Sequence, residues 1–149
     1  MINSDKSFLN LEELLEILRN FELESADFYG NLAGKEGGQE FQEVFIWLKE
    51  EELRHAEALE KINPRDYPKI HIQIPPELSL SMPQVPEYKT LAEILDLAID
   101  REERASGVYS KASGTVPSPL KDLFLSLAEW EGRHKQRLIL LKSEIVGRN

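Results

Sequence analysis

The same short pattern, a glutamate followed three residues later by a histidine, occurs twice in this chain of 149 residues. It stands at Glu52 and His55 and again at Glu131 and His134, seventy-nine residues later, and it uses two of only three histidines. Residues three apart share one face of a helix. Both pairs fall inside apolar stripes with helical spacing, so we expect the two pairs to point into one core.

Composition limits the class of protein. A hydrophobic content of 41% and a charged content of 30% are typical of a globular chain, and the length suits a single domain over residues 1–149. The net charge of −9 argues against nucleic-acid binding and is compatible with a site that concentrates cations. The chain has no cysteine, which excludes disulfides, thiolate zinc sites and iron–sulfur centres.

The first residues carry no apolar segment of the kind found in a signal peptide. No run approaches the roughly 18–20 apolar residues that a membrane span needs. We therefore expect a cytoplasmic protein with no membrane partner.

Apolar residues at helical spacing predict an all-α fold with four helices, over about residues 11–34, 39–62, 91–112 and 119–146. Two of these helices start with a capping box, formed by Asn10 with Glu13 and by Thr90 with Glu93. The last helix is expected to start at Pro119, because proline suits the first helical position.

The segment 63–90 is rich in proline and is expected to be a long crossover. Ile70, Ile72 and Ile74 alternate with polar residues, which is the period of an extended strand, and His71 is expected to be exposed. The isoleucines could pack across the bundle or pair with the same segment of a second subunit, so a homodimer is one expectation. The crossover lets the second and third helices run parallel.

The two halves of the chain also repeat in their other helices. Glu22 and Tyr29 are seven residues apart, as are Glu102 and Tyr109, eighty residues further on. Each half should form an antiparallel helical hairpin because its internal loop is short.

The repeat predicts a metal site. Four mid-helix carboxylates and two imidazoles should meet in the core, and burying four unpaired carboxylates would be prohibitive. Two divalent cations would neutralise them, and a mixed oxygen and nitrogen ligand set suits iron or manganese, or a mixed pair. The candidate metal ligands are Glu22, Glu52, His55, Glu102, Glu131 and His134.

A structural alternative is a bundle in which the buried glutamates and histidines pair with Arg54, with Arg133 or with each other. Trp47 and Trp130 are expected at the edge of the core, with a role in electron transfer as the alternative. Other glutamates lie off the inner stripes and are expected on the solvated surface: Glu50, Glu51, Glu103 and Glu129.

The pattern of Glu22 with Tyr29, Glu52-Leu-Arg-His55, Glu102 with Tyr109 and Glu131-Gly-Arg-His134 covers nearly the whole chain. It resembles a rubrerythrin-type di-iron protein of the ferritin-like superfamily, whose fold is a four-helix bundle with such a crossover.

The resemblance also implies roles for these residues. Glu52 and Glu131 would bridge two metal ions, and Glu22 and Glu102 would each bind one of them. Each histidine would bind one metal, and the tyrosines at 29 and 109 would donate hydrogen bonds to carboxylates of the site.

Two features depart from the family pattern. The chain has no rubredoxin domain, which would need cysteines, and Ala105 stands where such proteins carry a further carboxylate one turn after Glu102.

The resemblance implies an oxidoreductase that reacts with hydrogen peroxide or dioxygen and receives electrons from a separate donor protein. An iron-handling or storage protein that oxidises ferrous ion is the alternative, as is a metal-binding module without catalysis. Subunit count separates storage from the first function, because a dimer cannot enclose a mineral core.

Overall fold

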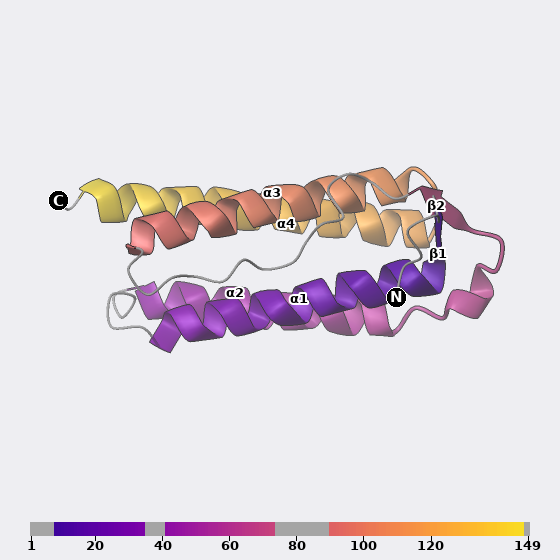
Figure 1. Cartoon of the computed structure of the whole chain (residues 1–149), viewed down its shortest axis with the longest axis horizontal. Coiled ribbons are helices and arrows are strands. Elements are labelled where there is room, and N and C mark those ends of the chain that lie inside the picture. Colours follow the sequence, from indigo (N-terminus) through magenta and orange to yellow (C-terminus); the bar gives the residue numbers. More distant parts are fainter. Residues whose placement is uncertain (1–7, 35–40, 74–89, 148–149) are drawn as a thin grey trace.

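The computed structural model describes residues 8–34, 41–73 and 90–147. It is predominantly helical, as predicted, with four long helices among the described residues. These helices lie side by side (Figure 1). The elements are β1 (Phe8–Asn10), α1 (Leu11–Gly34), α2 (Gln42–Glu60), the 3-10 turn η2 (Pro64–Asp66), β2 (His71–Gln73), α3 (Leu91–Ser113) and α4 (Leu120–Gly147).

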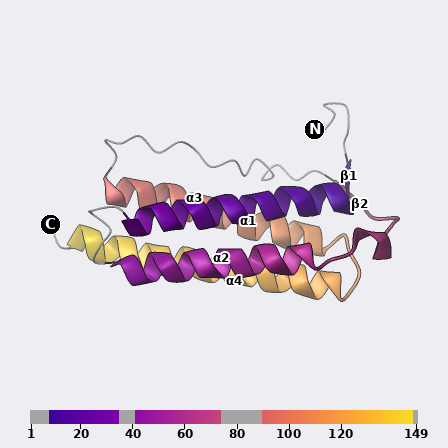
Figure 2. The ribbon, with the colours of Figure 1, turned by 90° about the horizontal axis from the view of Figure 1, so that it is seen from below.

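The helices form two antiparallel hairpins, α1 with α2 and α3 with α4 (Figure 1). Their backbones approach most closely within each hairpin. A view from below shows α1 lying over α3 and α2 lying over α4 (Figure 2). Helices α2 and α3 run in the same direction, as predicted (Figure 1). The four helices together form a helical bundle.

Both predicted capping boxes are present. The Asn10 side chain accepts a hydrogen bond from the Glu13 amide at 2.8 Å, and the Glu13 carboxylate accepts one from the Asn10 amide at 3.0 Å. Thr90 and Glu93 make the same reciprocal pair at the start of α3. Each box satisfies amide groups that the first helical turn leaves without a backbone partner.

Some predicted helix bounds differ from the structure. Helix α2 begins at Gln42 rather than residue 39 and ends at Glu60, two residues before the predicted end; residues 39–40 lie outside the described part. It ends early because Asn63 is extended, and its side chain accepts a hydrogen bond from the Arg65 amide to start η2. Helix α3 ends one residue later than predicted, and so does α4.

Helix α4 begins at Leu120, one residue after the predicted start at Pro119. The first helical hydrogen bonds run from the Lys121 amide to the Pro117 carbonyl and from the Leu123 amide to the Pro119 carbonyl, so Pro119 accepts a hydrogen bond just before the helix begins.

The predicted strand is present but covers only His71–Gln73. It pairs antiparallel with Phe8–Asn10, a strand that the sequence did not predict, with Leu9 opposite Ile72. Ile72 is buried in this chain's own core and Ile70 packs against the same core, while His71 is exposed as predicted. Ile74 and the rest of the predicted crossover to residue 89 lie outside the described residues.

The apolar core consists of two clusters, one at each end of the bundle. One cluster includes Leu18 and Phe124, and the other includes Phe45 and Leu138. On every helix the predicted metal ligands fall between the residues of the two clusters. A polar layer therefore separates two apolar layers, and the apolar layers hold the four helices around it.

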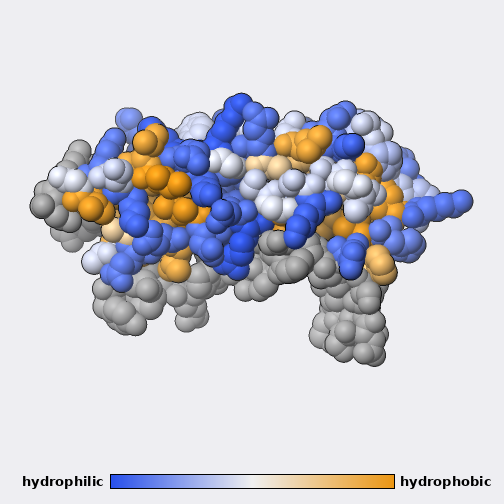
Figure 3. Space-filling model, turned by 90° about the horizontal axis from the view of Figure 1, so that it is seen from above, coloured by the Kyte–Doolittle hydropathy of each residue, from blue (hydrophilic) through white to orange (hydrophobic). Residues whose placement is uncertain are grey.

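Viewed from the side of α3 and α4, the surface is mostly hydrophilic, with separate apolar patches (Figure 3). Within residues 8–34, 41–73 and 90–147, no helix has both the length and the apolar character that crossing a membrane requires.

Candidate metal centre

The structure brings all six predicted ligands together from four helices. None of the six is more than 6% exposed. Helices α1 and α3 supply one glutamate each, and α2 and α4 each supply a glutamate and a histidine three residues later. The inner stripes of the helices were therefore assigned correctly: Glu22, Glu52, His55, Glu102, Glu131 and His134 all face the core.

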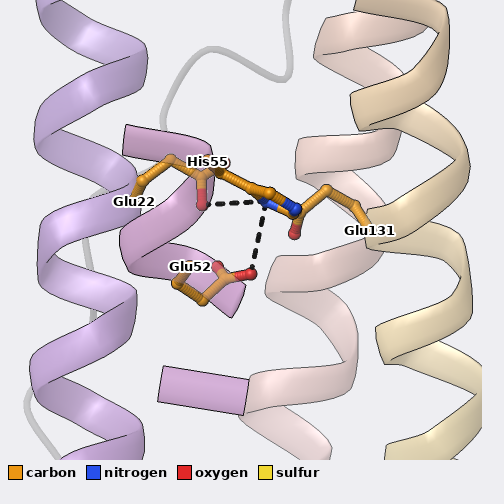
Figure 4. A group of neighbouring side chains, drawn as sticks. All are labelled: Glu22, Glu52, His55 and Glu131. Atoms are coloured by element: carbon orange, nitrogen blue, oxygen red, sulfur yellow. Dashed lines mark hydrogen bonds and ion pairs between the residues drawn. The ribbon is translucent and has the colours of Figure 1, made fainter. Parts of the chain in front are cut away.

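Four of these side chains form a first group. Glu22, Glu52, His55 and Glu131 each offer one ligand atom, and these atoms all lie within 4.8 Å of one another. Nδ1 of His55 lies 2.8 Å from Glu131, 3.5 Å from Glu22 and 3.7 Å from Glu52. Figure 4 shows these side chains converging from α1, α2 and α4. This arrangement could hold one cation.

A second group has the same composition. It consists of Glu52, Glu102, Glu131 and His134, again with ligand atoms within 4.8 Å of one another. Nδ1 of His134 lies 2.9 Å from Glu52, 3.7 Å from Glu102 and 3.9 Å from Glu131. The two groups share Glu52 and Glu131. These are the two carboxylates for which the resemblance implied a bridging role.

Two buried tyrosines hold the remaining two glutamates in a reciprocal way. The Tyr29 hydroxyl on α1 donates to Glu102 on α3 at 2.6 Å, and the Tyr109 hydroxyl on α3 donates to Glu22 on α1 at 2.7 Å. Burial, and then the negative charge of the bonded glutamate, raises the pKa of each tyrosine well above its usual value. Both hydroxyls therefore keep their protons and remain donors at neutral pH.

Several carboxylate oxygens of the centre lack a hydrogen-bond partner among the described residues. They are Oε2 of Glu22, Glu102 and Glu131 and both oxygens of Glu52. A buried polar atom without a partner is costly, and more so when it is charged. Divalent cations would satisfy such oxygens, so the side chains that are present fit a pair of metal ions.

The carboxyl groups also titrate abnormally when no cation is bound. Burial, followed by repulsion from neighbouring carboxylates, raises the pKa of Glu52 and of Glu131 well above the usual value. Burial opposes ionisation of Glu102 too, but its interactions with Glu131, with His134 and with the Tyr29 hydroxyl leave its pKa below the usual value. Without cations, burial and mutual repulsion thus favour the protonated forms of Glu52 and Glu131.

The two arginines of the structural alternative do not neutralise this centre. Arg54 pairs with Glu51, and Arg133 pairs with Glu129 at 2.6 Å. One expectation for the surface glutamates is wrong. The Glu51 side chain, which pairs with Arg54, is only 13% exposed and does not lie on the solvated surface. The other glutamates expected on the surface are exposed: Glu50, Glu103 and Glu129.

One charged residue near the centre was not predicted to be buried. Arg101, directly before Glu102, is only 2% exposed, and its guanidinium lies 4.3 Å from the centre of the Phe21 ring. Its Nη2 reaches Glu24 at 3.3 Å, whereas Nε and Nη1 have no hydrogen-bond partner among the described residues. Burial lowers its pKa. In the sequence it belongs to a charged run, Asp-Arg-Glu-Glu-Arg, that resembles a solvated helix face.

No model of a known protein family matches the chain, and no curated protein or solved structure has significant similarity to it. The assignment of the centre therefore depends on its own geometry.

Proposed function

We propose that the chain is a di-metal carboxylate protein, a rubrerythrin-like member of the ferritin-like group, and acts as an oxidoreductase on hydrogen peroxide or dioxygen. The observation that carries this proposal is the pair of four-residue groups that share Glu52 and Glu131. Glu52 and Glu131 would each contribute to holding both cations. One Glu from each of two helices and a Glu-x-x-His pair from each of the other two is the ligand arrangement of di-iron bundles.

Charge supports two cations rather than one. Four ionised glutamates bring four negative charges into a layer whose ligands are at most 6% exposed. Two divalent ions balance that charge while both histidines stay neutral, as metal ligation requires. A single divalent ion would leave two negative charges in the core, at a cost of several kcal/mol for each.

The ligand set favours iron or manganese. It contains four carboxylates and two imidazoles and no soft sulfur ligand, and the chain has no cysteine. Iron is the metal of this proposal because the reaction needs a metal that changes oxidation state. When bound, the iron pair would supply electrons to the oxidant and polarise its O–O bond.

The burial of the centre favours a small molecule as the oxidant. A pocket of about 650 Å³ lies on the outer side of α3 and α4, and no candidate ligand lines it. The centre itself is enclosed by the helices that carry it. A molecule the size of hydrogen peroxide or dioxygen suits such a centre, whereas a large organic substrate could not contact the ligands.

The protein's own contribution is to hold the carboxylates in place. The Tyr29 and Tyr109 hydroxyls occupy one oxygen each of Glu102 and Glu22, which leaves the other oxygen of each glutamate available to a cation. The apolar clusters on both sides exclude water and strengthen electrostatic interactions within the layer.

The test is rapid mixing of the anaerobic ferrous protein with hydrogen peroxide, followed by absorption of the ferric product. We expect oxidation much faster than that of the same concentration of free ferrous ion. Equal rates would show that the proposed function is wrong. A Glu52→Ala, Glu131→Ala double variant should lose the acceleration.

The chain offers a matched control. Glu50 and Glu129 lie two residues before the shared glutamates on the same helices, and both are exposed. A Glu50→Ala, Glu129→Ala double variant removes the same number of carboxylates from outside the centre. It should oxidise at the rate of the unaltered protein.

A further inference from the structure

A series of three aromatic rings leads from the protein surface to both histidines of the centre. Trp47 on α2 is 38% exposed, and its ring meets that of buried His134 edge-on, with centroids 5.5 Å apart and planes at 80°. The His134 ring in turn stacks on that of His55, at 5.5 Å and 10°. These are the spacings of aromatic rings in contact. A continuous series of ring contacts therefore connects the surface to both histidines of the centre.

The outer part of Trp47 can be reached from solvent. Its side chain lines a surface pocket of about 300 Å³ together with Glu43, Val44 and Arg137. These residues come from α2 and α4, the helices that carry the two histidines. A small molecule or the tip of a protein side chain in this pocket would touch the indole ring.

The second tryptophan has a different environment. Trp130 on α4 is also 38% exposed, but the guanidinium of Arg133 lies over its ring, 4.9 Å from the centroid. Among the described residues, Trp47 is the tryptophan whose ring contacts a histidine of the centre. Trp130 is therefore a matched control for exposure and residue type.

A buried redox centre needs a route for electrons, because a donor cannot touch the ligands directly. The geometry points to Trp47 as the residue through which electrons from an external one-electron donor enter the centre. This inference rests on the proposed function. Each transfer oxidises the donor by one electron and reduces one ferric ion to ferrous, so two transfers restore the reduced pair. The indole conducts the electron with no bond made or broken and no proton gained.

Fluorescence tests the coupling without turnover. The chain has two tryptophans. The indole fluorescence of a Trp130→Phe variant therefore comes from Trp47 alone, and that of a Trp47→Phe variant comes from Trp130 alone. Loading with ferric ion should strongly quench Trp47, because the excited indole can pass an electron to the metal, whereas redox-inactive zinc should quench it little. Trp130 should respond weakly to both metals. Equal responses of the two tryptophans to iron would overturn the inference.

Reduction kinetics test the route itself. The oxidised iron protein is mixed anaerobically with reduced methyl viologen, a one-electron donor, and loss of the ferric absorption is followed. Trp47→Leu should slow reduction several-fold, Trp47→Phe should retain most of the rate because a ring remains, and Trp130→Leu should have no effect. Metal content, measured for each variant, shows that the centre is still loaded.

The outcomes separate the two proposals. If iron binds and reacts rapidly with peroxide while Trp47→Leu is reduced as fast as the unaltered protein, the electron route is wrong and the proposed function stands. If Trp47→Leu and Trp47→Phe are slowed equally, the aromatic ring is not the route. If the protein binds no iron, both proposals fall.

Discussion

Nδ1 of His55 on α2 lies 2.8 Å from a carboxylate oxygen of Glu131 on α4, seventy-six residues further along the chain. The converse contact, from His134 on α4 to Glu52 on α2, measures 2.9 Å. Each histidine thus lies closer to the glutamate of the opposite helix than to the glutamate three residues before it. The two Glu-x-x-His pairs consequently form one centre, in which each histidine contacts the glutamate of the other pair.

Removing one tyrosine hydroxyl should destabilise the protein. In Tyr29→Phe, Glu102 loses its 2.6 Å hydrogen bond inside the core. Leaving a buried acceptor unsatisfied costs about 1–3 kcal/mol. Urea unfolding of the metal-free protein measures this change. Tyr67→Phe, at a partly exposed tyrosine outside the centre, is the control, and equal stability of the two variants would contradict the role assigned to Tyr29.

The metal-free protein should lose stability as the pH rises from acid toward neutral. The raised pKa values of Glu52 and Glu131 mean that the folded protein keeps protons that the unfolded chain releases. Their contribution is fully present below the unfolded pKa of about 4.3 and is lost as the pH rises through the higher folded pKa.

Urea midpoints of chelator-treated protein across this pH range check the sign. A Glu52→Gln, Glu131→Gln double variant should show a flatter profile, because it lacks both titrating groups. The prediction is contradicted if the unaltered metal-free protein shows no larger loss of stability with rising pH than this variant.

Truncating Phe124 should weaken both the fold and the metal centre. Phe124 is fully buried, and its ring lies 6.0 Å from that of Tyr109, whose hydroxyl holds Glu22. Phe124→Ala should cost about 3–5 kcal/mol of unfolding free energy, and it should lower metal affinity. The neighbouring Leu125 is 45% exposed, so Leu125→Ala should leave both properties almost unchanged. Equal losses of stability and metal affinity in the two variants would contradict the packing of Phe124 against Tyr109.

Removing the buried charge at Arg101 should tighten cation binding. Arg101 is buried and directly precedes Glu102 in the sequence. In a region of low polarity its positive charge repels the cations that the centre would bind. We expect Arg101→Gln to bind manganese(II) more tightly than the unaltered protein in a calorimetric titration. Arg104→Gln is the control, since Arg104 is partly exposed and pairs with Asp100 at the surface. Weaker binding by Arg101→Gln would indicate that the guanidinium supports the centre instead.

The centre could be predicted in detail because its residues are periodic. Glu22 and Glu102 are recognised as core residues since they interrupt apolar stripes, and the two Glu-x-x-His pairs identify their own helix faces. The capping boxes at Asn10 and Thr90 could also be predicted, because each depends only on residues within four positions of one another in the sequence.

Features that depend on tertiary packing could not be predicted. Strand β1 is three residues long, and its pairing with Ile72 joins segments more than sixty residues apart. The burial of Arg101 depends on the Phe21 ring and Glu24 of another helix, and nothing in its own charged neighbourhood indicates it. The contact between Trp47 and His134 likewise depends on how α2 and α4 pack.

Metal content is the most direct test of the central claim that six side chains form one dinuclear centre. Protein loaded with ferrous ion under anaerobic conditions and freed of unbound metal should contain two iron ions per chain by elemental analysis. The Glu52→Ala, Glu131→Ala variant should contain almost none, and the Glu50→Ala, Glu129→Ala variant should contain the full amount. Full metal content in the Glu52→Ala, Glu131→Ala variant would contradict the site described here.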